Sequence, residues 1–537
     1  MPQQRNCSPM KCRPMATGSG VASRAVHGRT QWWAFAAVFA LCTTAYVANL
    51  GSLQIGQHVD DSIYISVGRA LQAGLGYVRY EDPTHPHEQQ YPPGLPGLVA
   101  AVLWVSDGRI AALRLIPLVF SLASLFLADA FFRTRLPVGP DGRPVAAWRW
   151  LLAALFGLNH LVVGYAGMVM TEAPFVCLTL ATLVWLDRRD HQRTANPETP
   201  ASATWVLAMV LILVTGCLLR TIGWALVAAT GLWLWQRREP RTALIVVVVS
   251  IALLSPWMVA QHSWTGTWFG SGYQADITAN AGMKWHPLLR PVENLSVYAS
   301  TLLPEAVLPF FGNRMSALCA RASMGFIPGL IGSVFSTVIL LGGVILARRR
   351  SDPADWVFVA LALILLIWPF RYTRFCLPLV PIALVYLVAG GYLLTPRRRW
   401  WVWAVAGLAL VGFLARDAEM VVNPPHRDYP DIAALGHFVE KHTPPAATVL
   451  TTLPSAIGLY AERGVMDLHS DKTTGGPAEM TPAEFLARSA GREPRYVLLY
   501  PQRPGEAVEI PEFLKRAPFK HEADEARLGA QLFRIEP

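Results

Sequence analysis

The chain has 537 residues, of which 53% are hydrophobic and only 15% are charged, whereas an ordinary soluble domain carries about 25% charged residues. Together with 19 tryptophans, this composition excludes an ordinary soluble protein and predicts a polytopic membrane protein with aromatic belts. The net charge of +10 comes largely from arginines in short connections between apolar runs. Because no basic face with interleaved aromatic residues is found, no nucleic-acid partner is expected.

Eleven segments are predicted to be transmembrane helices, each of which needs about 20 mostly apolar residues. They are residues 32–50, 110–132, 147–164, 173–186, 204–219, 222–236, 242–261, 325–347, 355–370, 376–394 and 400–415. Arginines cluster in the N-terminal segment and in every second connection, and the alternate connections are sparse in basic residues. The positive-inside rule therefore places the N-terminus in the cytoplasm and, with an odd number of spans, the C-terminus outside.

This topology divides the chain into three parts. Residues 1–31 form a cytoplasmic N-terminal segment, and residues 32–415 form an all-α polytopic membrane domain. That domain has two long outer loops, 51–109 and 262–324. Residues 416–537 form a soluble extracytoplasmic domain. Because arginine greatly outnumbers lysine, we expect a bacterial source and hence an inner (plasma) membrane.

The C-terminal domain shows mixed periodicity. Residues 429–441 and 481–489 have helical patterns, whereas "ATVLTT" and "RYVLLY" favour strands. A small α/β domain is therefore predicted after the last span.

The first outer loop combines a helical pattern with a pair of carboxylates. "DDSIYISVGRALQAG" has apolar residues at helical spacing and a glycine at its end, which predicts a helix with Asp60 and Asp61 in its first turn. Helix capping explains one carboxylate, and chemistry at the outer membrane face is the alternative for the pair. The following "PPGLPGLVAAVLWV" is short and proline-rich, so we expect an interfacial helix that holds the loop against the bundle.

Further ionisable residues stand near the outer ends of the spans. Arg220, Arg371 and Arg374 are placed there, where such residues often mark function, although snorkelling to the headgroups is the simpler explanation. Arg114 lies further inside the second span, where it could instead satisfy a neighbouring carbonyl or carboxylate. Glu172 could bind an acceptor, pair with an arginine, or cap the fourth span.

No metal site is predicted. His85, His87 and Glu88 lie close together in the first loop, but they lack the i, i+4 spacing of helical metal ligands, which favours a solvated loop. The seven cysteines show neither a disulfide framework nor a zinc-binding spacing. No cofactor is therefore predicted, and a divalent metal is compatible with the motifs without being indicated.

The loop motif resembles a known superfamily. Acidic residues after the first span, then a tyrosine, "A-L-x-x-G" and a proline-bearing turn are similar to the C-type glycosyltransferases (GT-C fold). These polytopic enzymes, such as aminoarabinose transferases and protein O-mannosyltransferases, use lipid-phosphate-linked sugars. Their first outer loop holds the catalytic acidic motif, which here is the stretch from Asp60 to Tyr64.

Three more segments fit that superfamily in their order and sidedness over residues 32–415. They are "AALRLIPLVFSLAS" with Arg114, "MVMTEAP" with Glu172, and "FRYTRFCLPLVP" with Arg371, Tyr372 and Arg374. One position departs from the aminoarabinose transferases, whose phosphate-binding lysine beside the loop proline is replaced by Gln90-Tyr91-Pro92-Pro93. Another group must therefore meet the phosphate.

The resemblance implies an inverting transferase that moves a sugar from a polyprenyl-phosphate donor to a lipid, glycan or protein acceptor at the outer face of the membrane. It makes Asp60 the base, with Asp61 supporting it or holding water or acceptor. The implied donor-phosphate ligands are Arg220, Arg371, Arg374 and Arg114, and the implied substrate contacts are Tyr64, Tyr91, Glu172 and Tyr372.

Two other function classes compete with this prediction. A transporter or flippase should carry polar residues near the membrane midplane, often in paired halves. Here the informative charges collect at one face and no internal repeat is evident, which favours the enzyme. A non-catalytic assembly protein with an α/β tail is the third alternative.

Overall fold

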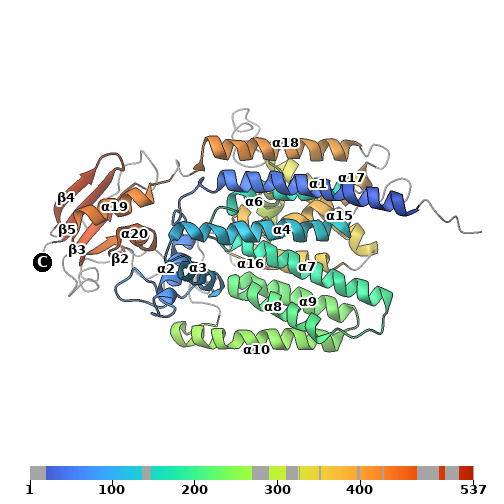
Figure 1. The fold of residues 1–537 in the computed structure, drawn as a ribbon, viewed down its shortest axis with the longest axis horizontal. Coiled ribbons are helices and arrows are strands. Elements are labelled where there is room, and N and C mark those ends of the chain that lie inside the picture. The colour runs from blue at the N-terminus through green and yellow to red at the C-terminus, as the bar shows by residue number, and fades with distance from the viewer. Residues whose placement is uncertain are drawn as a thin grey trace, which may run out of the picture.

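The structure is a computed structural model in which a helical bundle carries a small α/β domain at one end (Figure 1). It describes residues 20–135, 147–268, 289–309, 325, 327–349, 352–395, 400–425, 429–468, 495–501 and 519–535, with residues 20–31 described by their backbone alone. Helices α2 and α3 lie between the bundle and the sheet (Figure 1). The end of the bundle beside α2 and α3 is called the sheet-side end below.

The helical domain contains these elements in chain order: α1 (Gly20–Asn49), α2 (Val59–Gln72), α3 (Gly94–Val105), η1 (Ile110–Arg114), α4 (Leu115–Arg133), α5 (Ala147–Gly157), α6 (His160–Tyr165), α7 (Glu172–Ala195), α8 (Ala203–Leu219), η2 (Thr221–Gly223), α9 (Trp224–Gln236), α10 (Pro240–Thr265), α12 (Arg290–Val297), η4 (Tyr298–Leu302), α13 (Leu303–Val307), α15 (Ile327–Arg349), α16 (Pro353–Ile367), η5 (Thr373–Leu379), α17 (Val380–Leu394) and α18 (Trp400–Val422).

A helix overlaps each of the eleven predicted spans, but the number of spans is not confirmed. Within the described ranges, five helical segments are long and apolar enough to cross a membrane: Trp32–Asn49, Ile110–Arg133, Pro240–Thr265, Ile327–Arg348 and Thr373–Leu394.

The predicted span 147–164 is divided into α5 and α6, and Asn159 explains the division. Its side chain accepts a hydrogen bond from the Leu161 amide at 3.0 Å and so caps α6. It also donates to the Ala306 carbonyl at 2.7 Å, which ties the break to α13. A buried polar cap of this kind interrupts the helix because it satisfies backbone groups at a new start.

The two helices predicted inside the first loop are confirmed as α2 and α3. Asp60 and Asp61 lie in the first turn of α2, although the N-cap residue is His58. The helix ends at Gln72, followed by Gly74 at φ +74°. The two helices pack closely at Gly68, where a Cβ atom would lie 2.4 Å from a methyl carbon of Val99. This contact fixes α2 against α3 and so positions the acidic turn.

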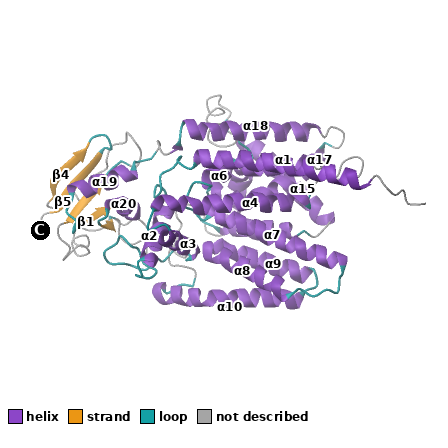
Figure 2. Ribbon diagram, viewed as in Figure 1, coloured by secondary structure: helices purple, strands orange, loops and turns teal. Residues whose placement is uncertain are grey.

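The C-terminal domain contains α19 (Ile432–His442), β1 (Thr448–Thr451), α20 (Pro454–Ala461), β2 (Gly464–Asp467), β3 (Arg495–Leu499), β4 (Phe519–Glu525) and β5 (Ala530–Ile535) (Figure 2). Its five described strands have the order β2-β1-β3-β5-β4; β1 is parallel to β2 and β3, and β5 is antiparallel to β3 and β4. This arrangement confirms the predicted α/β character. The helix predicted for 481–489 lies outside the described residues.

The C-terminal domain docks onto the loop that carries the acidic pair. The Tyr460 hydroxyl donates to the Ile55 carbonyl at 2.7 Å, just before α2. The Val465 amide donates to the Glu81 carbonyl at 2.9 Å, after α2. Residues on both sides of α2 are therefore held by the domain that follows the bundle.

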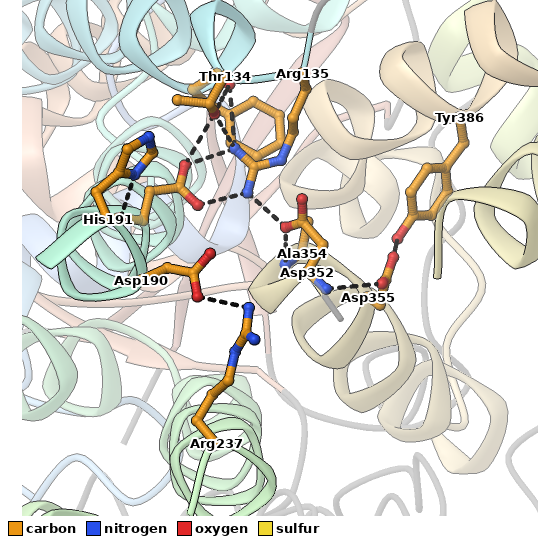
Figure 3. Close-up of polar contacts among 11 residues, drawn as sticks. Thr134, Arg135, Asp190, His191, Arg237, Asp352, Ala354, Asp355 and Tyr386 are labelled. Carbon is orange, nitrogen blue, oxygen red and sulfur yellow. Dashed lines mark hydrogen bonds and ion pairs between the residues drawn. The ribbon is translucent and has the colours of Figure 1, made fainter. Parts of the chain in front are cut away.

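A buried ion-pair network joins four helices at the end of α4 away from α2 and α3 (Figure 3). The Arg135 guanidinium donates to both oxygens of Asp187 at 2.6 and 2.7 Å, and to Asp352 at 2.5 Å. Asp352 starts α16 in a capping box with Asp355, which in turn accepts a hydrogen bond from Tyr386. The network thus connects α4, α7, α16 and α17.

Loss of Arg135 should destabilise the bundle strongly, because Asp187 would remain buried, and Asp352 largely buried, after this guanidinium is removed. We expect Arg135→Gln to cost about 3 kcal/mol or more, measured as a lowered unfolding temperature of the purified protein in detergent. Arg133→Gln is the matched control, since Arg133 is 63% exposed and makes a longer, weaker contact of 3.4 Å with Asp129. The cost of this substitution should stay below about 1 kcal/mol. Equal shifts for both variants would contradict a structural role for the network.

Candidate functional site

Asp60 lies at the sheet-side end with both carboxylate oxygens in use. Oδ1 accepts a hydrogen bond from the Tyr91 hydroxyl at 2.6 Å. Oδ2 accepts one from Nη2 of Arg374 at 2.9 Å. The side chains of Asp60 and Arg374 are 24% and 22% exposed, so a substrate can reach this ion pair. The contact joins the first loop to η5, 314 residues later in the sequence.

Glu172 connects Arg374 to a second arginine. Its Oε1 atom is 2.8 Å from Nη1 of Arg220 and 3.7 Å from Nε of Arg374. The Glu172 side chain is only 2% exposed, and its Oε2 atom has no hydrogen-bond partner. Because Glu172 is the first residue of α7, its carboxylate also lies at the favourable end of the helix dipole. Glu172 therefore pairs closely with Arg220 and lies near Arg374, the partner of Asp60.

Aromatic contacts hold Tyr91 against Asp60. The Tyr91 ring meets the buried Tyr64 ring edge to face, with centroids 4.8 Å apart. The Tyr77 hydroxyl donates to the Tyr91 carbonyl at 2.8 Å, and the Tyr77 ring packs on Trp257 and Trp264 of α10. Tyr91 is thus positioned as a hydrogen-bond donor to the carboxylate. Tyr64, which was predicted to contact substrate, is buried and packs against the Tyr91 ring.

The short helix η5 positions Arg374 beside two rings. The Arg374 guanidinium lies 5.1 Å from the ring centroid of Tyr372 and 5.5 Å from that of Phe375. The Thr373 hydroxyl donates to Glu305 at 2.7 Å, which ties the start of η5 to α13. Tyr372 itself is 50% exposed, so its ring remains accessible beside the guanidinium.

Asp61 does not join this group of contacts. It is 2% exposed, and its Oδ2 atom accepts a hydrogen bond from the Gly56 amide at 2.9 Å, which folds the turn before α2. Burial raises the pKa of Asp61 well above its ordinary value, against the opposite effect of the Gly56 amide. The paired carboxylates thus have different environments, one partly exposed and ion-paired, the other buried in the loop.

Arg114 and Arg371 also point elsewhere. Nη2 of Arg114 donates to the Leu53 carbonyl at 3.1 Å, so this arginine holds the chain between α1 and α2. Arg371 is 2.8 Å from Glu293 and also donates to the Asn294 side chain at 2.8 Å. Of the four predicted phosphate ligands, the structure pairs Arg374 with Asp60 and brings Arg220 near Arg374 through Glu172, and it gives the other two different partners.

Two residues of the site region had no role in the sequence analysis. His58 caps α2 with its backbone, and its Nε2 atom is buried without a hydrogen-bond partner. Burial and the nearby Arg374 lower the pKa of His58, although Asp60 and Glu172 oppose the shift. Asn294 is fully buried and donates to carbonyls at the end of α16. The position of His58 next to the acidic pair is a signal that sequence reasoning could have used.

His87 and Glu88 of the first loop contact an aromatic ring and an arginine. Glu88 pairs with Arg79 at 3.0 Å, and the His87 ring stacks on Trp264 at 4.5 Å. Within the described part of the chain, no three His, Cys, Asp or Glu side chains lie close enough to hold a metal ion.

The site therefore combines a partly exposed carboxylate with two guanidinium groups at one end of a helical membrane domain. A carboxylate in such a place can accept a proton, and guanidinium groups can bind the oxygens of an anionic phosphate. Rings of Tyr372 and Phe375 border the same space.

No protein-family model and no curated protein sequence matches the chain. Solved structures match its fold. ArnT from Cupriavidus metallidurans bound to undecaprenyl phosphate gives a TM-score of 0.56 at 14% identity, covering 94% of this chain and 99% of that chain. The Archaeoglobus fulgidus oligosaccharyltransferase AglB, in complex with an inhibitory peptide and a dolichol-phosphate, gives 0.52 at 10% identity, covering 87% and 69%. The chain thus has the GT-C-like fold that the sequence resemblance implied, and it is an integral membrane protein.

The buried state of Asp61 predicts a pH-dependent stability. A carboxyl whose pKa is raised in the folded state contributes stability at low pH that is lost as the pH rises through the folded pKa. Asp61→Asn keeps an acceptor for the Gly56 amide and removes the charge, so its unfolding temperature should exceed that of the wild type increasingly as the pH rises above about 3.8, the ordinary value. Thermal unfolding at a series of pH values tests this.

Asp107→Asn is the control for that series, because Asp107 is exposed and asparagine also tolerates its φ of +51°. It should follow the wild-type curve at every pH. An Asp61→Asn protein that is less stable than the wild type at pH 8 would contradict the burial argument.

Proposed function

We propose that this protein is an inverting glycosyltransferase that moves a sugar from a polyprenyl-phosphate donor to a lipid, glycan or protein acceptor. The observation that carries the proposal is the contact of Asp60 with Arg374, beside Arg220, at the sheet-side end of a GT-C-like fold. Two structures with this fold contain lipid phosphates, undecaprenyl phosphate in ArnT and dolichol-phosphate in AglB. Fold likeness at this identity supports the reaction class and leaves the sugar and the acceptor open.

In this proposal the two guanidinium groups meet the donor phosphate. Arg220 and Arg374 take over the phosphate-binding role of the lysine of the aminoarabinose transferases. In this sequence the position of that lysine is occupied by the Gln90-Tyr91 stretch. Cationic donors aimed at a leaving phosphate stabilise the charge that develops on it, which is often the largest catalytic contribution. Glu172 orients Arg220 through a 2.8 Å contact and stays near Arg374 at 3.7 Å, so it is a positioning residue for this pair.

Asp60 acts as the base in the same proposal. It takes the proton of the acceptor hydroxyl while that oxygen attacks the anomeric carbon from the face opposite the phosphate. A single displacement of this kind inverts the anomeric configuration. Tyr91 holds Oδ1 of Asp60 and leaves Oδ2, on the Arg374 side, as the oxygen nearest the phosphate ligands.

The proposed location is the outer face of a bacterial inner membrane. The arginine-rich connections predict a cytoplasmic N-terminus, and the network around Arg135 would lie at the cytoplasmic end of the bundle. The sheet-side end and the C-terminal domain would then face outward, where flipped lipid-linked sugars are used. The five apolar spans support membrane integration.

Sugar transfer from synthetic polyprenyl-phosphate sugars by the purified protein in lipid nanodiscs tests the proposal. Asp60→Asn should reduce transfer by about 10²–10⁴-fold, the usual contribution of a positioned base. Asp107→Asn, the same chemical change at an exposed aspartate, should transfer at the wild-type rate. Equal transfer by Asp60→Asn and wild type, with both proteins folded, would rule Asp60 out as the base.

A further inference from the structure

The four charged groups of the site cancel one another in the absence of substrate. Asp60 and Glu172 supply two carboxylates, and Arg220 and Arg374 supply two guanidinium groups. The arginines that the proposed function assigns to a phosphate are therefore already paired with carboxylates. Binding an anion into such a neutral cluster requires one of these pairs to open, because an unopened pair offers the phosphate little net attraction.

The contact between Asp60 and Arg374 is the pair best placed to open. Both side chains are partly exposed, whereas Glu172 is 2% exposed. Nε of Arg374 lies 3.7 Å from Glu172, too far for a hydrogen bond, and it has no hydrogen-bond partner. Arg374 can therefore turn toward a new oxygen while Glu172 remains near. The rings of Tyr372 and Phe375 border its guanidinium group and limit that turn.

The same contact also competes with an acceptor hydroxyl for Asp60. Oδ1 of Asp60 is occupied by Tyr91 and Oδ2 by Arg374. An acceptor hydroxyl must share Oδ1 or Oδ2 with the donor already bound there, and it gains an unshared oxygen only when one of these donors leaves. Arg374 is the donor that an arriving phosphate would attract, because a guanidinium binds phosphate oxygens at least as strongly as it binds a carboxylate.

Resting on the proposed function, we infer that Arg374 exchanges partners during each turnover: the donor phosphate takes Arg374 from Asp60, and this exchange frees Oδ2 of Asp60 for the acceptor hydroxyl. Donor binding thereby creates the base. In the resting protein, Arg374 keeps Asp60 occupied, so Asp60 can bind an acceptor hydroxyl productively only after the donor is in place.

The step balances in atoms and charge. The acceptor oxygen forms a bond to the anomeric carbon, and its proton passes to Oδ2 of Asp60. The bond from that carbon to the phosphate oxygen breaks, and the electron pair stays on the polyprenyl phosphate. The phosphodiester donor has one negative charge and the fully ionised phosphomonoester product has two, so the added charge equals the charge that Asp60 loses on protonation. The net charge of the cluster together with its bound phosphate is therefore the same before and after transfer.

The inference predicts an unusual sign for a substitution at the proposed base. Asp60→Asn cannot compete as an anion for Arg374, so the variant should bind undecaprenyl phosphate about tenfold more tightly than the wild type, the scale of a lost charge-assisted competitor. Titration of the full-length protein in nanodiscs with undecaprenyl phosphate measures this. Asp60→Ser should show the same gain, and it serves if the asparagine variant does not fold.

Two controls separate partner exchange from a general change in charge. Glu293→Gln removes a carboxylate from the neighbouring pair with Arg371, at the same exposure of 24%, and should leave the affinity unchanged. Arg374→Gln combined with Asp60→Asn should abolish the gain, because no guanidinium is left to release. Equal tightening by Glu293→Gln and Asp60→Asn, or no tightening by either Asp60 variant, would overturn the inference and leave the proposed function standing. A wild-type protein that binds no polyprenyl phosphate would overturn both.

Discussion

The ion pair between Asp60 and Arg374 is the contact on which the account of this protein depends. It joins the first loop of the membrane domain to a short helix 314 residues later. It can form only because α2 and α3 are fixed between the bundle and the C-terminal domain, and because η5 starts a late helix at the same end. Tyr91 then donates a hydrogen bond to Asp60, and Glu172 lies near Arg374. The pair is partly exposed, which distinguishes a contact that can exchange partners from one that only stabilises.

The two ends of the bundle use ion pairs differently. The Arg135 side chain is 6% exposed, and its terminal nitrogens are engaged by Asp187, Asp352 and Thr134. Such a buried network orders the helices. At the sheet-side end, the guanidinium of Arg374 has one short contact to a carboxylate and one longer one. The arrangement around Arg374 therefore has the freedom that binding of an anion requires.

Several residues of the candidate site could be singled out from the sequence, and physical reasons explain what sequence patterns missed. Asp60 could be found because it follows the first span and begins an amphipathic helix. Arg220, Arg374 and Glu172 could be placed at one membrane face from hydrophobicity and arginine bias, but those patterns cannot tell which carboxylate each arginine meets. Arg371 lies just before η5, three residues ahead of Arg374. Its pairing with Glu293 depends on how α12 packs against the end of α16.

Other limits of sequence reasoning came from local structure. Asp60 and Asp61 have different environments because only Asp61 faces the turn at Gly56, whose amide donates to it. Neighbouring positions on a helix point in different directions, so a shift of one residue separates an exposed side chain from a buried one. The span predicted for 147–164 contains a break because Asn159 is buried and finds backbone partners, and apolar composition alone does not reveal it. The predicted α/β domain was correct in character because helix and strand patterns are local, whereas the mixed strand order follows from tertiary packing.

The most direct test of the central claim is a double-mutant cycle on sugar transfer, with Asp60→Asn, Arg374→Gln and the double variant assayed at matched expression and folding. If the two side chains act on one bound donor as a unit, their losses are strongly non-additive, and the double variant is about as slow as the slower single variant. Losses that multiply, or a single variant that transfers sugar at the wild-type rate, would contradict a shared role for this ion pair.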